Sequence, residues 1–302
     1  MNTNDTRKKL FHQLLPNLSK NNNFPDSEKT LLLGFACDEG VRRNNGRPGA
    51  FGGPEAFKEQ WEHRPGDEDK IADGGIFTIN SQALSLFQRS FGAVVSKGLD
   101  QYRRVLAIGG GHEITWAMHL GMLGATCNSE KPVIGHLNFD AHFDLRPYYM
   151  GANSGTSFRQ ISDERKFANQ PYHYLCLGLD SKSTPDFLFD AAHHLGVKFH
   201  LNEAVLQWST ADWIECIEAF AEPLDRLYVT VDMDVFHADA APGVSAVAKN
   251  GLQPDALLPV FEFLSTFDKV QCLDIAELNP IFDRDDRTAR LAVRVARALA
   301  GL

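Results

Sequence analysis

The chain has 302 residues, of which 43% are apolar and 23% are charged, as in typical globular proteins. Its formal net charge of -9 excludes nonspecific binding to nucleic acid or an anionic membrane, because both need a basic surface. The sequence offers no apolar signal segment or membrane span, and its five cysteines lack disulfide or metal-binding spacing, so we expect a cytoplasmic protein.

Short apolar segments alternate with helical patterns from about residue 30 onward, which is typical of a parallel sheet covered by helices. Most of these segments are continuously apolar, as expected of strands that are buried on both faces. The predicted strands span residues 30–36, 104–109, 132–139, 172–179, 197–201, 226–233 and 269–276.

Helical spacing of apolar residues appears between these strands, and Pro54 and Pro254 suit first helical turns. We therefore predict a single domain over residues 1–302 with three layers, helix over sheet over helix. The polar residues 1–28 are expected to form an appendage with one short helix. The predicted helices span residues 7–15, 81–99, 114–125, 211–222, 253–267 and 286–300.

Acidic and imidazole side chains follow four of the predicted strands, at the end where open parallel sheets bind ligands. Any one of them alone would most often be a helix cap or a structural histidine. Residues two apart on an extended chain line one face, so the three in the FDAHFD segment should point the same way. The strand-end residues are His112, Asp140, His142, Asp144, Asp232, Asp234, Asp274 and Glu277.

Several carboxylates in one crevice repel one another by several kcal/mol unless cations neutralise them. Four aspartates and two histidines without a thiolate suit Mn²⁺ better than a structural zinc site. Two divalent ions balance four aspartates, and such pairs activate a water molecule between them. The pattern therefore favours a hydrolase with two metal ions.

The sequence resembles the arginase/agmatinase family of ureohydrolases in motif order and spacing over most of its length. The resemblance implies an α/β fold, a three-layer α/β/α arrangement with a parallel eight-stranded sheet. It also implies a small-molecule substrate, two Mn²⁺ per subunit and a homo-oligomer. It rests on GGGHE (109–113), FDAHFD (139–144), VDMDVF (231–236), DIAELNP (274–280) and the loop segment GRPGAFGGPEAF (46–57).

The family pattern also implies a role for each strand-end residue. Asp144 would hydrogen-bond the bridging hydroxide and pass its proton to the leaving nitrogen, while Glu277 would bind the amidine or guanidine nitrogens. Asp274 matches a motif position to which we assign only a structural role. One Mn²⁺ would be held by His112, Asp140, Asp144 and Asp232, and the other by Asp140, His142, Asp232 and Asp234.

Two departures from the arginase pattern narrow the expected substrate. Phe158, in SGTSFRQ (154–160), stands where arginases have a histidine that moves protons, and His237-Ala238 replaces the usual Asp-Pro. Together with AAPGVSA (240–246), these segments look like the formimidoylglutamase branch of the family. That branch hydrolyses N-formimidoyl-L-glutamate to L-glutamate and formamide in histidine degradation.

Formimidoylglutamate has two carboxylates in its tail, so its site needs cationic donors, and arginine binds carboxylates through paired hydrogen bonds. We expect Arg159 to be the carboxylate anchor, with Asn153 and Glu277 as further substrate-binding residues. For the other nearby arginines a solvated or loop-bracing role is an equal alternative. These are Arg42, Arg43, Arg47 and Arg146.

Three alternatives remain open at this point. An agmatinase or guanidinobutyrase would release urea, although the cationic tail of agmatine would make Arg159 useless or harmful. A zinc deacetylase of the same broad fold needs only one Asp-His-Asp site. A non-catalytic scaffold would usually have lost metal ligands, and this chain keeps all six positions.

Overall fold

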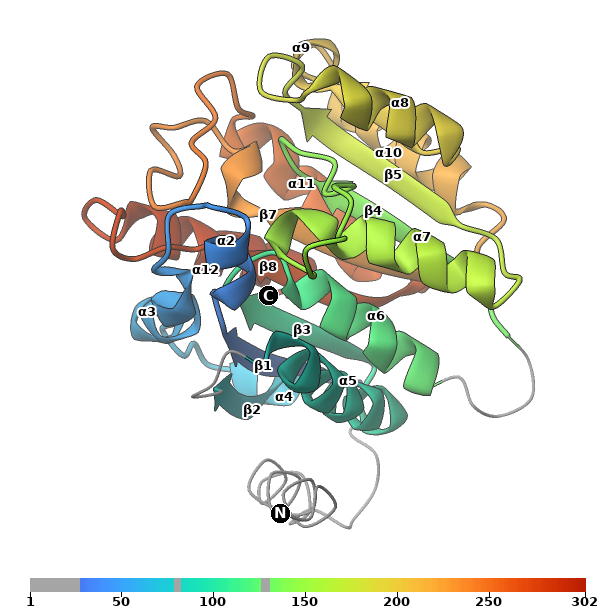
Figure 1. The fold of residues 1–302 in the computed structure, drawn as a ribbon. Helices are drawn as coiled ribbons and strands as arrows, with labels where there is room; N and C mark the ends of the chain where they lie inside the picture. The colour runs from blue at the N-terminus through green and yellow to red at the C-terminus, as the bar shows by residue number, and fades with distance from the viewer. Residues whose placement is uncertain (1–27, 79–82, 126–130) are drawn as a thin grey trace.

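The computed structural model describes residues 28–78, 83–125 and 131–302; the helix predicted at 7–15 lies outside them. It contains an eight-stranded, all-parallel sheet with the order β2-β1-β3-β8-β7-β4-β5-β6 (Figure 1). The strands are β1 (Thr30–Ala36), β2 (Ile71–Thr78), β3 (Arg104–Gly109), β4 (Ile134–Phe139), β5 (His173–Leu179), β6 (Lys198–Leu201), β7 (Arg226–Asp232) and β8 (Val270–Ala276).

The predicted helices within the described residues are confirmed to within a few residues at each end. Pro54 and Pro254 stand in first turns, as expected from their fixed backbone angle. The helices are α2 (Glu39–Arg43), α3 (Gly53–Gln60), α4 (Asp67–Lys70), α5 (Leu84–Gln101), α6 (Ile114–Gly124), α7 (Ser157–Phe167), α8 (Asp186–His194), α9 (Asn202–Val205), α10 (Thr210–Ala221), α11 (Pro254–Thr266) and α12 (Arg287–Ala300).

The sheet separates two apolar layers, so the predicted three-layer architecture is confirmed. On one face, α5 to α8 pack over residues such as Leu31 and Tyr174. On the other face, α3 and α10 to α12 pack over residues such as Leu32 and Leu175 (Figure 1). Neighbouring residues of one strand point to opposite layers, which explains why the central strands are apolar throughout.

The strand β2 was not among the seven predicted from the sequence pattern. Its sequence, IADGGIFT, contains an aspartate and two glycines, and the strand is only partly buried. Among the described residues it lies at the edge of the sheet and pairs with β1 alone, so it is more exposed than the central strands. The eighth strand implied by the family resemblance is therefore present but has no apolar signature.

The four strands that precede the predicted site residues are neighbours in the sheet, in the order β3-β8-β7-β4. Because all four are parallel, their carboxyl ends lie along one edge of the sheet. This order brings segments far apart in the sequence to one site. None of the helices in the described part of the chain has the length and apolarity that crossing a membrane demands.

Candidate metal centre

The loop after β4 carries three of the expected ligands. The strand ends at Phe139, so Asp140, His142 and Asp144 do not alternate along a strand, and the expectation that strand geometry would align them was wrong. Instead the backbone N–H of His142 donates to Asp140 Oδ1 at 2.6 Å. Asp144 adopts a left-handed backbone with φ of 51°. A tight loop directs these side chains toward one another.

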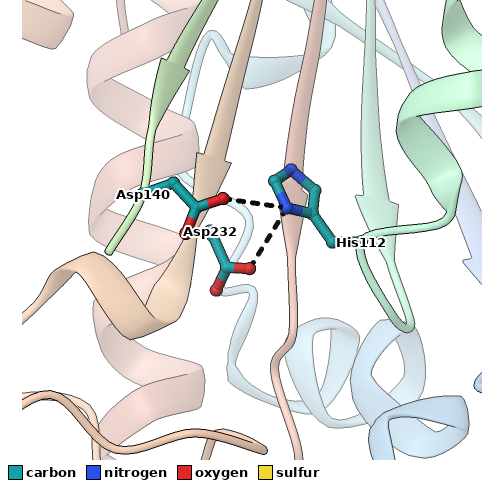
Figure 2. Close-up of side chains that lie close together, drawn as sticks. All are labelled: His112, Asp140 and Asp232. Carbon is teal, nitrogen blue, oxygen red and sulfur yellow. Dashed lines mark ion pairs between the residues drawn. The ribbon is translucent and has the colours of Figure 1, made fainter. Parts of the chain in front are cut away.

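His112 lies at the centre of the first ligand group. Its Nδ1 is 3.2 Å from Asp140 Oδ2, 2.9 Å from Asp144 Oδ2 and 3.2 Å from Asp232 Oδ2. Figure 2 shows Asp140 and Asp232 meeting the same nitrogen of the His112 ring. The imidazole is buried, with His112 1% exposed. His112, Asp140 and Asp232 are close enough for one cation to contact all three.

A second ligand group adjoins the first and shares Asp140 with it. His142 Nδ1 is 3.4 Å from Asp140 Oδ1 and 3.1 Å from Asp234 Oδ2, so these three residues form another possible cation site. The two oxygens of Asp140 therefore face different histidines. The structure brings all six expected ligands together, and we call them the acidic cage: His112, Asp140, His142, Asp144, Asp232 and Asp234.

The electrostatics of the acidic cage fit a divalent cation. Burial, followed by the charges of Asp234 and Asp140, raises the pKa of Asp232 well above its ordinary value. Burial opposes protonation of His112, but the surrounding carboxylates raise its pKa well above the usual range. His112 Nδ1 is buried and lies close to three carboxylates, but none of these contacts has the geometry of a hydrogen bond. The cage therefore needs positive charge, and its oxygen-rich donors with two imidazoles suit Mn²⁺.

Glu277 follows β8 and faces the same site. Its Oε1 accepts a hydrogen bond from the backbone N–H of His112 at 2.9 Å, whereas its Oε2 is buried without a partner. Burial and then the charge of Glu113 raise the pKa of Glu277 to about 8. The residue has φ of 65°, a conformation that non-glycine residues rarely adopt outside strained or functional sites.

Glu113 is a buried carboxyl to which sequence reasoning gave no role. It accepts a hydrogen bond from the backbone N–H of Gly40 at 2.7 Å and so ties α2 to the loop after β3. Burial raises its pKa to about 7. Gly110 allows this close packing, because a Cβ there would lie 1.9 Å from the carbonyl oxygen of Cys37. Gly110 and Glu113 both belong to the GGGHE motif, so this motif was the sequence feature that could have indicated the role of Glu113.

A cavity of about 300 Å³ opens over the acidic cage. Its wall combines cage residues and Glu277 with polar residues from the loops after β1 and β4 and a few residues near α8. The loop residues that line it are Asn44, Asn45, Gly46, Arg47, Phe143, Arg146, Ser154, Ser245 and Ala246. The cavity is the natural place for a small substrate to meet the cage.

The structure does not bring Arg159 or Asn153 to this cavity. Arg159 lines a separate hollow with Tyr148 and Tyr149, and its Nε is 3.4 Å from Asp163 Oδ1. Asn153 caps the short 3-10 turn Ser154–Thr156, with Oδ1 accepting from the backbone N–H of Gly155. Neither residue lines the cavity over the acidic cage, and a role for either in substrate binding stays a prediction.

The arginines that follow β1 are held by nearby groups. Arg42 pairs with Asp38 and Arg43 pairs with Glu39, each at 2.9 Å on α2. Arg47 lines the cavity but donates to the carbonyl oxygens of Val244 and Ser245, and its guanidinium lies 4.0 Å from the Phe282 ring centroid. These residues brace loops.

Phe158 is part of the core. Its ring stacks on Tyr174 at 4.0 Å and meets the His112 ring edge-on at 6.0 Å. It is buried beside His112 and does not line the cavity over the acidic cage.

Comparisons with known proteins agree with this architecture. A family model described as the arginase family matches residues 28–301. The chain is 39% identical over 275 residues to a formimidoylglutamase of Legionella pneumophila (strain Paris), covering 90% of this chain and 85% of the relative. It is 39% identical over 295 residues to a formimidoylglutamase of Clostridium tetani (strain Massachusetts / E88), covering 94% and 87%.

A solved structure, Trypanosoma cruzi formiminoglutamase with Mn²⁺, has the same fold. Its TM-score is 0.80 at 24% identity, and the match covers 95% of this chain and 96% of that one. The likeness in fold agrees with the family match and with the two sequence relatives. The chain therefore belongs to the arginase family.

Proposed function

We propose that this chain hydrolyses N-formimidoyl-L-glutamate to L-glutamate and formamide. The two formimidoylglutamase relatives, each 39% identical over most of the chain, support this activity. The observation that carries the choice of substrate is the presence of Arg146 in the same cavity as the acidic cage. A cationic group there suits a substrate that has an amidine at one end and carboxylates at the other.

The acidic cage would hold two Mn²⁺ ions. The sharing of Asp140 by two adjacent ligand groups supports this arrangement. The chemistry that such ions supply when bound is to lower the pKa of a water molecule, which provides hydroxide near neutral pH. We assign one ion to His112, Asp140, Asp144 and Asp232, and the other to Asp140, His142, Asp232 and Asp234.

Glu277 would orient the formimidoyl group. Its Oε2 has no hydrogen-bond partner, while Oε1 is fixed by the backbone of His112. The free oxygen can accept an N–H from the amidine, whose positive charge also satisfies a buried carboxylate. This contact would hold the formimidoyl carbon over the acidic cage.

Asp144 would carry the proton. Its carboxylate lines the cavity at the cage, where it can accept a hydrogen from the attacking water. The water oxygen bonds to the formimidoyl carbon and becomes the carbonyl oxygen of formamide, as its second hydrogen leaves as a proton that the released amine takes up to become an ammonium. The bond between that carbon and the glutamate nitrogen breaks, and the proton held by Asp144 passes to this nitrogen.

We propose Arg146, in place of Arg159, as the carboxylate anchor. Its backbone N–H donates to the Gly155 carbonyl at 2.9 Å, which fixes the loop. A Cβ at Gly155 would lie 3.0 Å from both Arg146 Cδ and Asn44 Nδ2, so glycine leaves room for the guanidinium. Across residues 28–78, 83–125 and 131–302, no ion pair or side-chain hydrogen bond engages Arg146.

A product assay tests the proposed reaction. Mn²⁺-loaded protein is incubated separately with formimidoylglutamate, agmatine and arginine, and formamide and urea are measured. We expect formamide from the first substrate only. Urea from agmatine or arginine would favour the ureohydrolase alternative, and no turnover of any substrate would favour a scaffold. One tightly bound zinc per chain without manganese would favour a deacetylase.

The substitution Arg146→Met tests the anchor, with Arg159→Met as the matched control. A charge-assisted hydrogen bond contributes about 1.5–3 kcal/mol, so we expect the KM of Arg146→Met to rise about 10- to 100-fold. Arg159→Met should change KM less than about twofold, because Arg159 lies outside the cavity. The opposite ranking would restore Arg159 as the anchor. Thermal unfolding of both variants checks the fold.

The homo-oligomer expected from the family resemblance stays a prediction. Light scattering on the purified protein measures the mass in solution and tests it directly.

A further inference from the structure

His112 makes a second contact on the side of its ring that faces away from the acidic cage. Its Nε2 is 2.9 Å from Thr230 Oγ1, and this hydroxyl is 2.8 Å from Asp274 Oδ1. The other oxygen of Asp274 accepts a hydrogen bond from the Tyr228 hydroxyl. All four side chains are buried. Thr230 and Asp274 are paired across β7 and β8, so the sheet register fixes their contact.

The direction of these hydrogen bonds follows from the number of hydrogens. An ionised carboxylate only accepts, and a hydroxyl has a single hydrogen to donate. Thr230 must therefore donate to Asp274, which leaves an oxygen lone pair facing His112 Nε2. The Nε2 atom must then carry a hydrogen. Burial raises the pKa of Asp274 to about 6, which still leaves the carboxyl ionised at neutral pH.

We propose that Asp274 is a positioning residue that, through Thr230, keeps the hydrogen of His112 on Nε2 and leaves the Nδ1 lone pair for a metal ion. The inference rests on the metal centre in the proposed function and assigns a role to a residue that touches neither metal nor substrate. Nδ1 is the atom that lies among Asp140, Asp144 and Asp232. Partners of this kind typically change metal affinity 10- to 100-fold.

The substitution Asp274→Asn should reverse the direction of the hydrogen bonds that link Asp274, Thr230 and His112, with little change in side-chain shape. The amide nitrogen can donate to Thr230, whose hydroxyl is then free to donate to Nε2. The hydrogen of neutral His112 would move to Nδ1 and block the metal. We expect the affinity for Mn²⁺ at one site to fall about 10- to 100-fold, measured by calorimetry on protein stripped with EDTA.

Substitutions at Thr230 supply a matched pair. Thr230→Ser keeps the hydroxyl and should retain the wild-type affinity for Mn²⁺ within about threefold. Thr230→Val has nearly the same volume but no hydroxyl, so it should lose affinity as Asp274→Asn does. Tyr228→Phe removes a buried hydroxyl that does not contact His112, and it should affect Mn²⁺ binding less than either. Circular dichroism of each metal-free variant checks folding.

Retained binding of two Mn²⁺ with wild-type affinity by Asp274→Asn would overturn the inference, as would equal losses in Thr230→Ser and Thr230→Val. If Asp274→Asn does not fold, the Thr230 pair decides. Wild-type protein that binds Mn²⁺ but releases no formamide would refute the proposed function and leave the positioning role standing. Wild-type protein that binds no Mn²⁺ would overturn both.

Discussion

The two histidines of the acidic cage are held in different ways. His112 is buried, its ring lies beside Phe158, and its Nε2 contacts Thr230. His142 lies in the loop after β4, and its side chain is 30% exposed. Within the described part of the chain we find no hydrogen bond to its Nε2. The group around His112 is therefore fixed by the sheet, and we call it the buried half. The group around His142 is held by a loop and is partly exposed, and we call it the open half.

This difference indicates that the two halves of the cage differ in their affinity for a metal ion and in their response to the substrate. A ligand whose ring is fixed loses little conformational freedom when a metal binds, whereas an exposed ligand must be ordered at that moment. The buried half should then bind its ion more tightly. The open half should respond more to the substrate, because the His142 side chain is 30% exposed whereas that of His112 is 2% exposed.

The largest expected effect comes from removing the carboxylate that both halves share. Asp140 contacts His112 through Oδ2 and His142 through Oδ1. Asp140→Asn should weaken both metal sites and reduce formamide release by at least on the order of 10³-fold, beyond the 10- to 100-fold typical of residues that only orient a ligand. Metal analysis after dialysis and single-substrate kinetics measure the two effects. Loss of only one ion would show that the halves are separable.

Removing each histidine in turn tests the asymmetry directly. We expect His112→Ala and His142→Ala each to retain about one Mn²⁺ per chain, because each variant leaves one ligand group whole. The affinity for the remaining ion should be higher in His142→Ala, which keeps the buried half. Calorimetry on the metal-free variants measures this. Equal affinities, or a higher affinity in His112→Ala, would contradict the comparison.

The effect of Mn²⁺ on thermal stability should grow as the pH rises. Burial and the charge of Asp234 raise the pKa of Asp232; burial opposes protonation of His112, but its three carboxylate neighbours raise its pKa well above the usual range. The folded, metal-free protein then holds protons that the unfolded chain releases. These bound protons stabilise the folded, metal-free protein. The stabilisation is complete below the unfolded-state pKa values, about 4 for Asp232 and about 6.5 for His112, and it is lost as the pH rises through the folded-state pKa values.

Thermal unfolding with Mn²⁺ and with EDTA between pH 6 and 8.5 measures this effect. Mn²⁺ replaces the protons, so the rise in Tm that it causes should be larger at pH 8.5 than at pH 6. The increase should be smaller in His112→Ala than in His142→Ala, because three carboxylates face His112 and two face His142. A rise in Tm that shrinks with increasing pH would be inconsistent with these shifts.

The smallest expected effect concerns the wall of the buried half. Phe158→Leu should lower the free energy of unfolding by about 1 kcal/mol, because the ring that packs between Tyr174 and His112 is replaced by a smaller apolar group. Mn²⁺ affinity should change less than about threefold, since the hydrogen bond to Thr230 remains. Urea unfolding and calorimetry measure the two quantities. A loss of affinity as large as that expected for Thr230→Val would mean that packing, rather than hydrogen bonding, orients His112.

The acidic cage was predictable from the sequence because parallel strands end at one edge of a sheet. That rule needs only that the strands run parallel, and it predicted that His112, Asp232 and Glu277 would lie at one edge of the sheet without knowledge of any loop. The convergence of Asp140, His142 and Asp144 was predicted for the wrong reason. The strand ends at Phe139, and hydrogen bonds in the following loop determine the result.

The choice between Arg146 and Arg159 could not be made from the sequence. Both follow the ligands of the loop after β4, and their directions depend on where that loop turns and where α7 begins. The role of Asp274 was hidden for a related reason. Its contact with Thr230 depends on the register between β7 and β8, which apolar sequence patterns do not specify. The strand β2 lacked the apolar pattern because it lies at the edge of the described sheet and is only partly buried.

Asp144 and Glu277, the two residues proposed to handle the proton and the amidine, share one further property. Both have left-handed backbones, with φ of 51° and 65°. This conformation costs residues other than glycine about 1–2 kcal/mol. A chain selected for stability alone would place glycine at both positions and would be inert. We expect Glu277→Gly to raise the free energy of unfolding by about 1 kcal/mol, measured in urea, while abolishing formamide release. A fall in stability would show that the Glu277 carboxylate also supports the fold.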